Sequence, residues 1–248
     1  MLNFSNIEFD YDPYPIGITR PALVPDFYAE LVRTFPAIEL FRYMESKGEK
    51  YSLSQYNNGA VYRRFLKTTP AWRRFHCYIH SPEFISGTYD MLRHYNLDLD
   101  LPPPGFVQRM SQRISAWKRD RPIPHFPRIK ARFEFSAMPI TGGNILPHTD
   151  STRKSVTMVV PILEEGEWDS AWGGGTSVVR PRDPTRMFNR IDYRLDFDEV
   201  DTVKTFAFAP NQCLVFVRTD TSWHAVMPMT GTDPTILRKT LTINIETS

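Results

Sequence analysis

A series of short strands in the C-terminal half most restricts the fold of this chain. From Ile129 to Met138, apolar side chains alternate with largely polar ones, the period of a strand with one apolar and one polar face. Further strand-like segments follow, joined by turn-rich sequence: Ser155 to Ile162, Thr176 to Arg180, Thr202 to Ala209, Gln212 to Arg218, Ala225 to Pro228 and Leu237 to Ile245. Because no helical repeat separates them, they predict an antiparallel sandwich or barrel over residues 129–248.

The first 128 residues have a different pattern. Apolar residues recur at helical spacing in three segments, which predict helices: Asp26 to Phe35, Pro70 to Ile79 and Pro82 to Tyr95. Ser81 is placed to cap the third of these helices. The length of 248 residues and the hydrophobic fraction of 41% fit one domain. We therefore expect a single domain, with a helix-containing part (1–128) beside a β core (129–248).

Two N-terminal segments are harder to place. Leu97 to Pro127 resembles a long proline-rich connection, with a short helical piece around Val107 to Trp117. Tyr56 to Arg64 has the composition of a turn, which could fold over a site in the β core.

Composition excludes some classes of partner. The formal net charge of +2 gives no reason to expect nucleic-acid binding. No apolar stretch is long enough to cross a membrane, and residues 1–14 do not look like a secretory signal. The two cysteines, Cys77 and Cys213, do not form a zinc or disulfide pattern, so we expect a reducing cytoplasm.

The triplet His148-Thr149-Asp150 and the distant His224 are candidate metal ligands. In an extended chain, residues two apart project to the same side, so His148 and Asp150 can reach one ion. Two imidazoles and one carboxylate are the facial set that binds non-haem Fe(II) and leaves positions open.

Two other interpretations of the histidines must be weighed. The triplet alone also fits a surface His–Asp pair, with His224 as an unrelated core residue. The order of the surrounding features favours a metal site: a Gly-rich turn, the triplet, a strand, Gly173-Gly174-Gly175, and then His224. A second pair, His76 and His80, has the spacing of a zinc site on a helix but has no further ligand nearby in the sequence.

The strand from Leu237 to Ile245 carries a candidate anion site. Its polar face presents Arg238, Thr240, Thr242 and Asn244. A guanidinium followed by hydroxyls can bind a carboxylate, although a solvent-facing polar side would have the same pattern.

From about Ile129 to Ile245, a little under half of the chain, the sequence resembles the Fe(II)/2-oxoglutarate-dependent oxygenases, above all their prolyl-hydroxylase-like branch. Arg238 falls where that family has its 2-oxoglutarate-binding basic residue, and Thr242 where a supporting hydroxyl can occur. The other matching stretches are the Gly-rich approach Met138 to Asp150, the strand Val156 to Val160, the segment Gly173 to Thr176, and the segment Leu214 to Val226 with the distal histidine.

The resemblance implies a mainly β fold with flanking α-helices around a double-stranded β-helix (jelly-roll, cupin-like) core. It implies Fe(II) bound by His148, Asp150 and His224, with 2-oxoglutarate and O2 as cosubstrates. The 2-oxoglutarate C5 carboxylate would pair with Arg238. The implied reaction is hydroxylation of an unactivated C–H bond, coupled to conversion of 2-oxoglutarate to succinate.

The sequence departs from this family at two positions. Prolyl hydroxylases often have tyrosines near 2-oxoglutarate where this chain has Met138 and Pro161. The C5 carboxylate is then expected to rely on Arg238 and Thr242, with help from Thr157 or Ser136. The alternative is a non-haem iron oxidase of this fold that does not use 2-oxoglutarate.

The substrate is expected to be a small polar or anionic molecule. Arg132 and Glu134 lie on the polar face of the first core strand, and Arg153 and Trp223 flank the predicted metal ligands. Two alternatives are a peptidyl (prolyl-type) hydroxylase and a non-catalytic jelly-roll binding module. The complete ligand set argues against the binding module.

Overall fold

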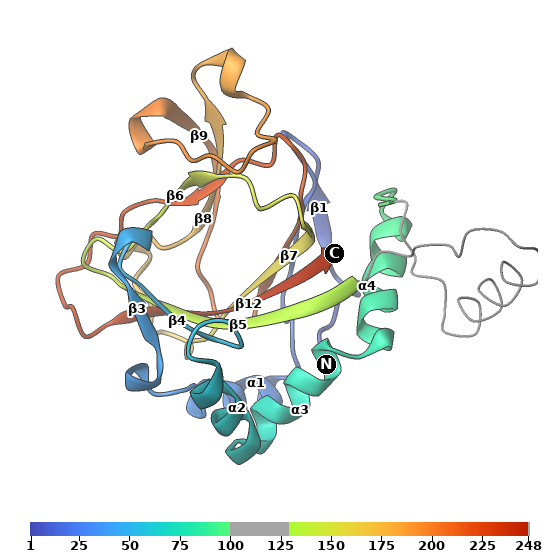
Figure 1. Ribbon diagram of the computed structural model, residues 1–248, viewed down its shortest axis with the longest axis vertical. Helices are drawn as coiled ribbons and strands as arrows, with labels where there is room; N and C mark the ends of the chain where they lie inside the picture. Colours follow the sequence, from blue (N-terminus) through green and yellow to red (C-terminus); the bar gives the residue numbers. More distant parts are fainter. Residues whose placement is uncertain (100–128, 248) are drawn as a thin grey trace, which may run out of the picture.

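The computed structural model describes residues 1–99 and 129–247. Two antiparallel sheets face each other, and helices cover the outer side of the larger one (Figure 1). The helical piece predicted at Val107 to Trp117 lies outside the described residues. None of the helices in the described ranges is long and apolar enough to cross a membrane.

The larger sheet has eight strands in the order β1-β2-β10-β7-β12-β5-β4-β3. Their bounds are β1 (Glu8–Asp10), β2 (Ile16–Thr19), β3 (Arg42–Met44), β4 (Lys50–Ser54), β5 (Ile129–Pro139), β7 (Lys154–Pro161), β10 (Cys213–Val217) and β12 (Leu237–Thr247). The smaller sheet has four strands in the order β6-β11-β8-β9. They are β6 (Ile145–His148), β8 (Thr176–Pro181), β9 (Val200–Phe206) and β11 (His224–Val226).

Strands β5 to β12 form a double-stranded β-helix. Along the chain they pass between the sheets, so that β5, β7, β10 and β12 lie in the larger sheet and the other four in the smaller. This arrangement confirms the jelly-roll core predicted from the sequence. The N-terminal strands β1 to β4, which the sequence did not predict, extend the larger sheet at both edges.

Four α-helices cover the larger sheet: α1 (Pro25–Arg33), α2 (Gly59–Thr68), α3 (Pro70–Ile79) and α4 (Pro82–His94). Short 3-10 helices occur at Ile38–Leu40, Glu45–Lys47, Ser170–Trp172, Pro184–Arg186 and Phe197–Glu199. As predicted, the Ser81 hydroxyl caps α4 by accepting a hydrogen bond from the Phe84 amide at 3.1 Å. Helix α2 was not predicted, because the turn expected from Tyr56 to Arg64 becomes helical at Gly59.

The alternation along β5 separates two environments. Phe133 and Phe135 point outward and pack edge-on against Trp72 of α3, with ring centroids 6.1 and 4.7 Å away. The alternating polar residues of β5 point inward, between the two sheets, where Arg132, Glu134 and Ser136 line a cavity. Packing of the helices thus determines which face of β5 faces the interior of the jelly roll.

Candidate active site

The cavity between the two sheets has a volume of about 340 Å³, in the range of small-molecule sites. Both sheets contribute to its wall. The larger sheet supplies polar residues of β5, β7 and β12, and the smaller sheet supplies residues of β6, β8 and β11.

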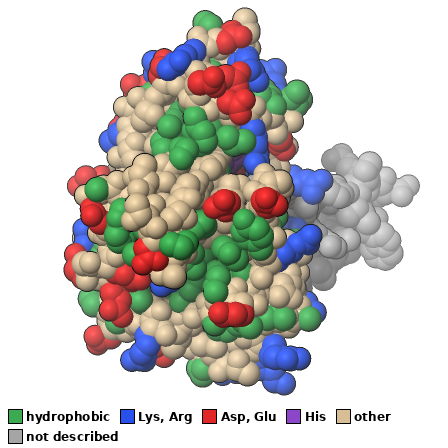
Figure 2. Space-filling model, turned by 90° about the vertical axis from the view of Figure 1, so that its left-hand side faces the viewer, with side chains coloured by type: hydrophobic (Ala, Val, Ile, Leu, Met, Phe, Trp, Pro, Cys, Tyr) green, Lys and Arg blue, Asp and Glu red, His purple; other side chains and the backbone are tan. Residues whose placement is uncertain are grey.

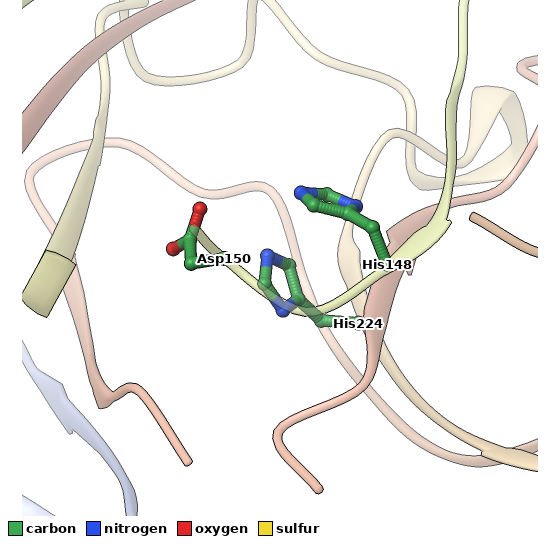
Figure 3. A group of neighbouring side chains, drawn as sticks. All are labelled: His148, Asp150 and His224. Atoms are coloured by element: carbon green, nitrogen blue, oxygen red, sulfur yellow. The ribbon is translucent and has the colours of Figure 1, made fainter. Parts of the chain in front are cut away.

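The three predicted metal ligands meet on one wall of this cavity. His148, the last residue of β6, pairs directly with His224, the first residue of β11, and their rings are 4.4 Å apart. Asp150 follows two residues after His148, and one potential ligand atom from each residue lies within 4.8 Å of the others. Figure 3 shows the three side chains converging from these two segments.

Backbone hydrogen bonds orient both imidazole rings. Nδ1 of His148 lies 2.8 Å from the Leu146 carbonyl, and Nδ1 of His224 lies 2.9 Å from the Ser222 carbonyl. A carbonyl only accepts, so each Nδ1 carries the proton and each Nε2 has a free lone pair. This is the usual way in which a protein prepares a metal-binding histidine.

Electrostatics place all three groups in the metal-binding protonation state. Burial, reinforced by His224, lowers the pKa of His148 to about 3, and burial also lowers the pKa of His224. Burial by itself would raise the pKa of Asp150, but Lys154 and the two imidazoles hold it well below its ordinary range. Two neutral nitrogens and one carboxylate are therefore available at neutral pH, which fits Fe(II).

The Asp150 carboxylate is held at both oxygens. Lys154 Nζ lies 2.5 Å from Oδ1, and the Thr157 hydroxyl lies 2.5 Å from Oδ2. The Arg218 guanidinium donates to the Asp150 main-chain carbonyl at 3.2 Å. Thr157, expected beside 2-oxoglutarate, thus contacts a predicted metal ligand, while Lys154 and Arg218 were not predicted at all.

Arg238 of β12 is a buried cation in the cavity wall, with 3% of its surface exposed. Its Nε donates to the Gly174 carbonyl, and its guanidinium lies 4.8 Å from the Phe208 ring centroid. Burial lowers its pKa to about 10, so it stays charged at neutral pH. Among residues 1–99 and 129–247 it forms no ion pair, so its charge is available to an anion in the cavity.

The polar face of β12 has the composition predicted from its alternation. Arg238, Thr240, Thr242 and Asn244 all line the cavity. Ser136 of β5 also lines it, and its hydroxyl lies 2.8 Å from that of Thr240. Met138 and Pro161, which stand where prolyl hydroxylases often have tyrosines, do not line it.

A second charged cluster lies on β5. Glu134 is almost fully buried and accepts hydrogen bonds from Lys50 at 2.8 Å and from Ser52 at 3.0 Å. Arg132 donates to its other oxygen. Burial alone would raise the pKa of Glu134, but Lys50 and Arg132 outweigh it and lower the pKa to about 2. As predicted, Arg132 and Glu134 line the cavity.

Two of the predicted substrate residues, Trp223 and Arg153, do not line the cavity. Trp223 is fully buried in a separate apolar cluster, where its indole N–H donates to the Met187 carbonyl at 2.8 Å. It precedes His224, and neighbouring strand residues point to opposite faces. Arg153 is exposed and lies outside the cavity lining. Both predictions relied on closeness in sequence to metal ligands, which does not determine side-chain direction.

Comparison with known proteins gives structural likeness only. No protein-family model matches the chain, and no curated protein matches it. A prolyl-4-hydroxylase from Pseudomonas putida is similar at 13% identity and a TM-score of 0.45, over 96% of this chain and 95% of that one. HygX from Streptomyces hygroscopicus, with nickel and 2-oxoglutarate bound, is similar at 7% identity and a TM-score of 0.47, over 95% and 84%. The α-ketoglutarate-dependent epimerase SnoN from nogalamycin biosynthesis is similar at 11% identity and a TM-score of 0.44, over 93% and 76%.

Proposed function

We propose that this protein is a non-haem Fe(II)- and 2-oxoglutarate-dependent dioxygenase that hydroxylates an unactivated C–H bond of a small polar molecule. The observation that carries the proposal is the presence of the His148–Asp150–His224 cluster and the buried Arg238 in the wall of one cavity. The three residues are a candidate metal-binding set, and Arg238 is a cation without a carboxylate partner among residues 1–99 and 129–247.

His148, Asp150 and His224 are the proposed Fe(II) ligands. Bound Fe(II) would supply the activation of O2 that amino-acid side chains cannot provide. The protein contributes the orientation of the ligands: backbone carbonyls set the two imidazole tautomers, and Lys154 and Thr157 hold the carboxylate. Thr157 is accordingly proposed to orient a ligand, rather than to bind the cosubstrate as the sequence suggested.

Arg238 is the proposed partner of the 2-oxoglutarate C5 carboxylate. With Nε committed to Gly174, the terminal nitrogens of the guanidinium remain as donors. Thr242 and Ser136 line the same cavity and can add hydroxyl donors. A buried charge of this kind is costly unless an anion neutralises it, which favours 2-oxoglutarate use over the alternative of an iron oxidase without a cosubstrate.

The charge of the cavity favours a polar or anionic substrate. Its described wall carries five cationic side chains, Lys50, Arg132, Lys154, Arg194 and Arg238, against three carboxylates, Glu134, Asp150 and Asp192. Iron as a dication and 2-oxoglutarate as a dianion would leave this surplus unchanged. The face of the molecule drawn in Figure 2 instead shows basic and acidic side chains interspersed. Arg132 and Glu134 are the proposed substrate contacts carried over from the sequence.

Anaerobic titration with Fe(II) and then 2-oxoglutarate tests the proposal. We expect one Fe(II) per chain, and a weak charge-transfer absorption in the visible region when 2-oxoglutarate is added. Under air, the loaded protein should form succinate slowly. His148→Ala should lose all three signals. Iron binding that is unchanged in His148→Ala would show that the proposed centre is wrong, and iron binding without the absorption would favour the iron oxidase.

A further inference from the structure

The segment between β8 and β9 brings Arg194, which has no ion pair in the described part of the chain, beside the proposed metal ligands. Residues 182–199 leave the smaller sheet and return to it, as the excursion at the top of Figure 1 shows. Within this segment, Arg194 forms an isolated antiparallel bridge with His148, and the Leu195 amide donates to the Pro147 carbonyl at 3.0 Å. The excursion is therefore anchored at β6, next to a proposed metal ligand.

This bridge sets the direction of the Arg194 side chain. Residues directly opposite in an antiparallel pair point to the same face, with Cβ atoms about 5 Å apart. His148 pairs with Arg194 on one side and with His224 on the other. Arg194, His148 and His224 thus form one row across the smaller sheet, and all three line the cavity.

The guanidinium of Arg194 has no polar partner among the described residues. It is exposed, and within the described ranges it forms neither an ion pair nor a side-chain hydrogen bond. Asp192, two residues earlier, also lines the cavity but does not pair with it. Three other cations of the cavity are neutralised, Lys50 and Arg132 by Glu134 and Lys154 by Asp150, and the remaining one, Arg238, is assigned to 2-oxoglutarate.

Further hydrogen bonds hold the excursion, and with it Arg194, in one position beside the barrel. Arg218 donates to the carbonyls of Asp150 and Asn189 and pairs with Asp220 at 2.6 Å. The fully buried side chain of Asn189 bonds to both the amide and the carbonyl of Tyr193. One arginine therefore connects the backbone of a metal ligand to the loop that presents Arg194.

We propose that Arg194 binds an anionic group of the substrate, so that the substrate is a small carboxylate or phosphate held over the open face of the metal centre. This inference deepens the proposed function and rests on it. Arg238, on the larger sheet, is assigned to the cosubstrate, and Arg194, on the smaller sheet, to the substrate. The two anions would then enter from different walls.

Ligand-observed NMR on the Zn(II)- and 2-oxoglutarate-loaded protein tests this assignment. The probes are small molecules in matched forms: a free carboxylate, its primary amide and, where available, its phosphate analogue. We expect acids to bind and their amides to bind at least tenfold more weakly. Binding of carboxylates alone, or of phosphates alone, would identify which anionic group the substrate carries.

The variants separate this inference from the proposed function. Arg194→Gln should weaken binding of the acids at least tenfold and leave 2-oxoglutarate binding intact, and Arg194→Lys should restore part of the affinity. Arg153→Gln removes the same charge from an exposed site outside the cavity and should have no effect. The inference would be overturned if acids and amides bound equally or if no probe bound selectively as an acid. It would also be overturned if Arg194→Gln bound the acids as well as the wild type does. Failure of the wild-type protein to bind 2-oxoglutarate would instead count against the proposed function, and acid binding lost only in Arg238→Gln would assign the acids to Arg238.

Discussion

Arg238 and Gly174, 64 residues apart in the sequence, are joined by a hydrogen bond from the guanidinium Nε to the glycine carbonyl. The bond fixes the proposed cosubstrate-binding arginine to the segment that leads into β8. The backbone of Gly174 has φ +79°, and a Cβ there would lie 2.7 Å from Trp168 and 3.4 Å from the Arg238 side chain. A side chain at this position would therefore clash with Trp168 and disturb the segment whose carbonyl accepts from Arg238.

Gly174→Ala should weaken 2-oxoglutarate binding about tenfold or more while metal affinity is kept. The added methyl group must displace Trp168 and crowds Met229, 3.1 Å away, which disturbs the backbone that accepts from Arg238. The positive φ adds about 1 kcal/mol of strain. Calorimetric titration of 2-oxoglutarate against the metal-loaded variant measures the effect. Gly173→Ala is the matched control, because Gly173 has the same φ of +79° but a Cβ added there would meet no atom within 4 Å. Equal losses in both variants would attribute the effect to backbone strain alone.

Arg238→Ala should reduce 2-oxoglutarate affinity by about 10- to 100-fold, the usual value of a charge-assisted pair, and leave Fe(II) binding unchanged. The buried cation has no carboxylate in the described part of the chain, so the fold does not depend on it for neutralisation. Titrations of Fe(II) and of 2-oxoglutarate on the same preparation check both parts of this prediction. Loss of folding, seen by circular dichroism, would mean that Arg238 is structural.

Thr157→Val should weaken metal binding about 10- to 100-fold, as is typical when a group that orients a ligand is removed. The substitution preserves shape but removes the hydroxyl that lies 2.5 Å from Asp150. Competition with a chromophoric chelator gives the affinity. Thr242→Val makes the same change elsewhere in the cavity wall and should affect 2-oxoglutarate instead of the metal. If Thr157→Val instead weakened 2-oxoglutarate binding and left metal binding unchanged, Thr157 would have the cosubstrate role first expected from the sequence.

Divalent metal should raise the melting temperature of the wild-type protein and not that of His148→Ala. A ligand that binds only the native state stabilises it by about 2.7 kcal/mol at a hundredfold excess over Kd. Differential scanning fluorimetry with Zn(II) or Ni(II), and then with a chelator, measures the shift and its reversal. A similar rise in His148→Ala would place the metal elsewhere.

Glu134 should make the protein sensitive to acid. Its pKa is lowered from 4.5 to about 2 in the folded state, so the stabilisation it provides is complete above pH 4.5 and is lost as pH falls toward 2. The full effect is about 3 kcal/mol. Urea unfolding between pH 7 and pH 3 should show a flatter stability profile for Glu134→Gln than for the wild type. The exposed Glu8→Gln should retain the wild-type profile; identical profiles for Glu134→Gln and wild type would refute the prediction.

The strands of the jelly roll could be predicted where the sequence alternates over many residues, as in β5 and β12. Strand β6 could not, because it has only four residues and one of them is Pro147. Helix α2 was missed because the turn-forming residues Asn57 and Asn58 precede it directly and Gly59 is its first residue. Local signals of this kind identify long regular elements but not short ones that tertiary contacts stabilise.

The metal ligands could be proposed from the sequence because His148 and Asp150 are close together in it. The roles of Arg218 and Arg194 could not, because each depends on a long-range pairing. Arg194 is placed by the bridge to His148, 46 residues away in the chain, and by the bond from Leu195 to Pro147. Lys154 lies only four residues from Asp150, but lysines are mostly exposed, so the sequence did not mark it as a partner. Trp223 shows the converse error, since it adjoins a ligand in sequence and lies on the opposite face in space.

The excursion from 182 to 199 lies outside the barrel strands, while His148, His224 and Arg238 belong to barrel strands and Asp150 lies just after β6. Under the two proposals, iron binding and choice of substrate belong to separate stretches of polypeptide. A change in the length of the excursion by a single residue would turn position 194 away from the cavity without moving a proposed metal ligand. Exchanging this one loop would then alter the proposed substrate contact and leave the proposed metal centre unchanged.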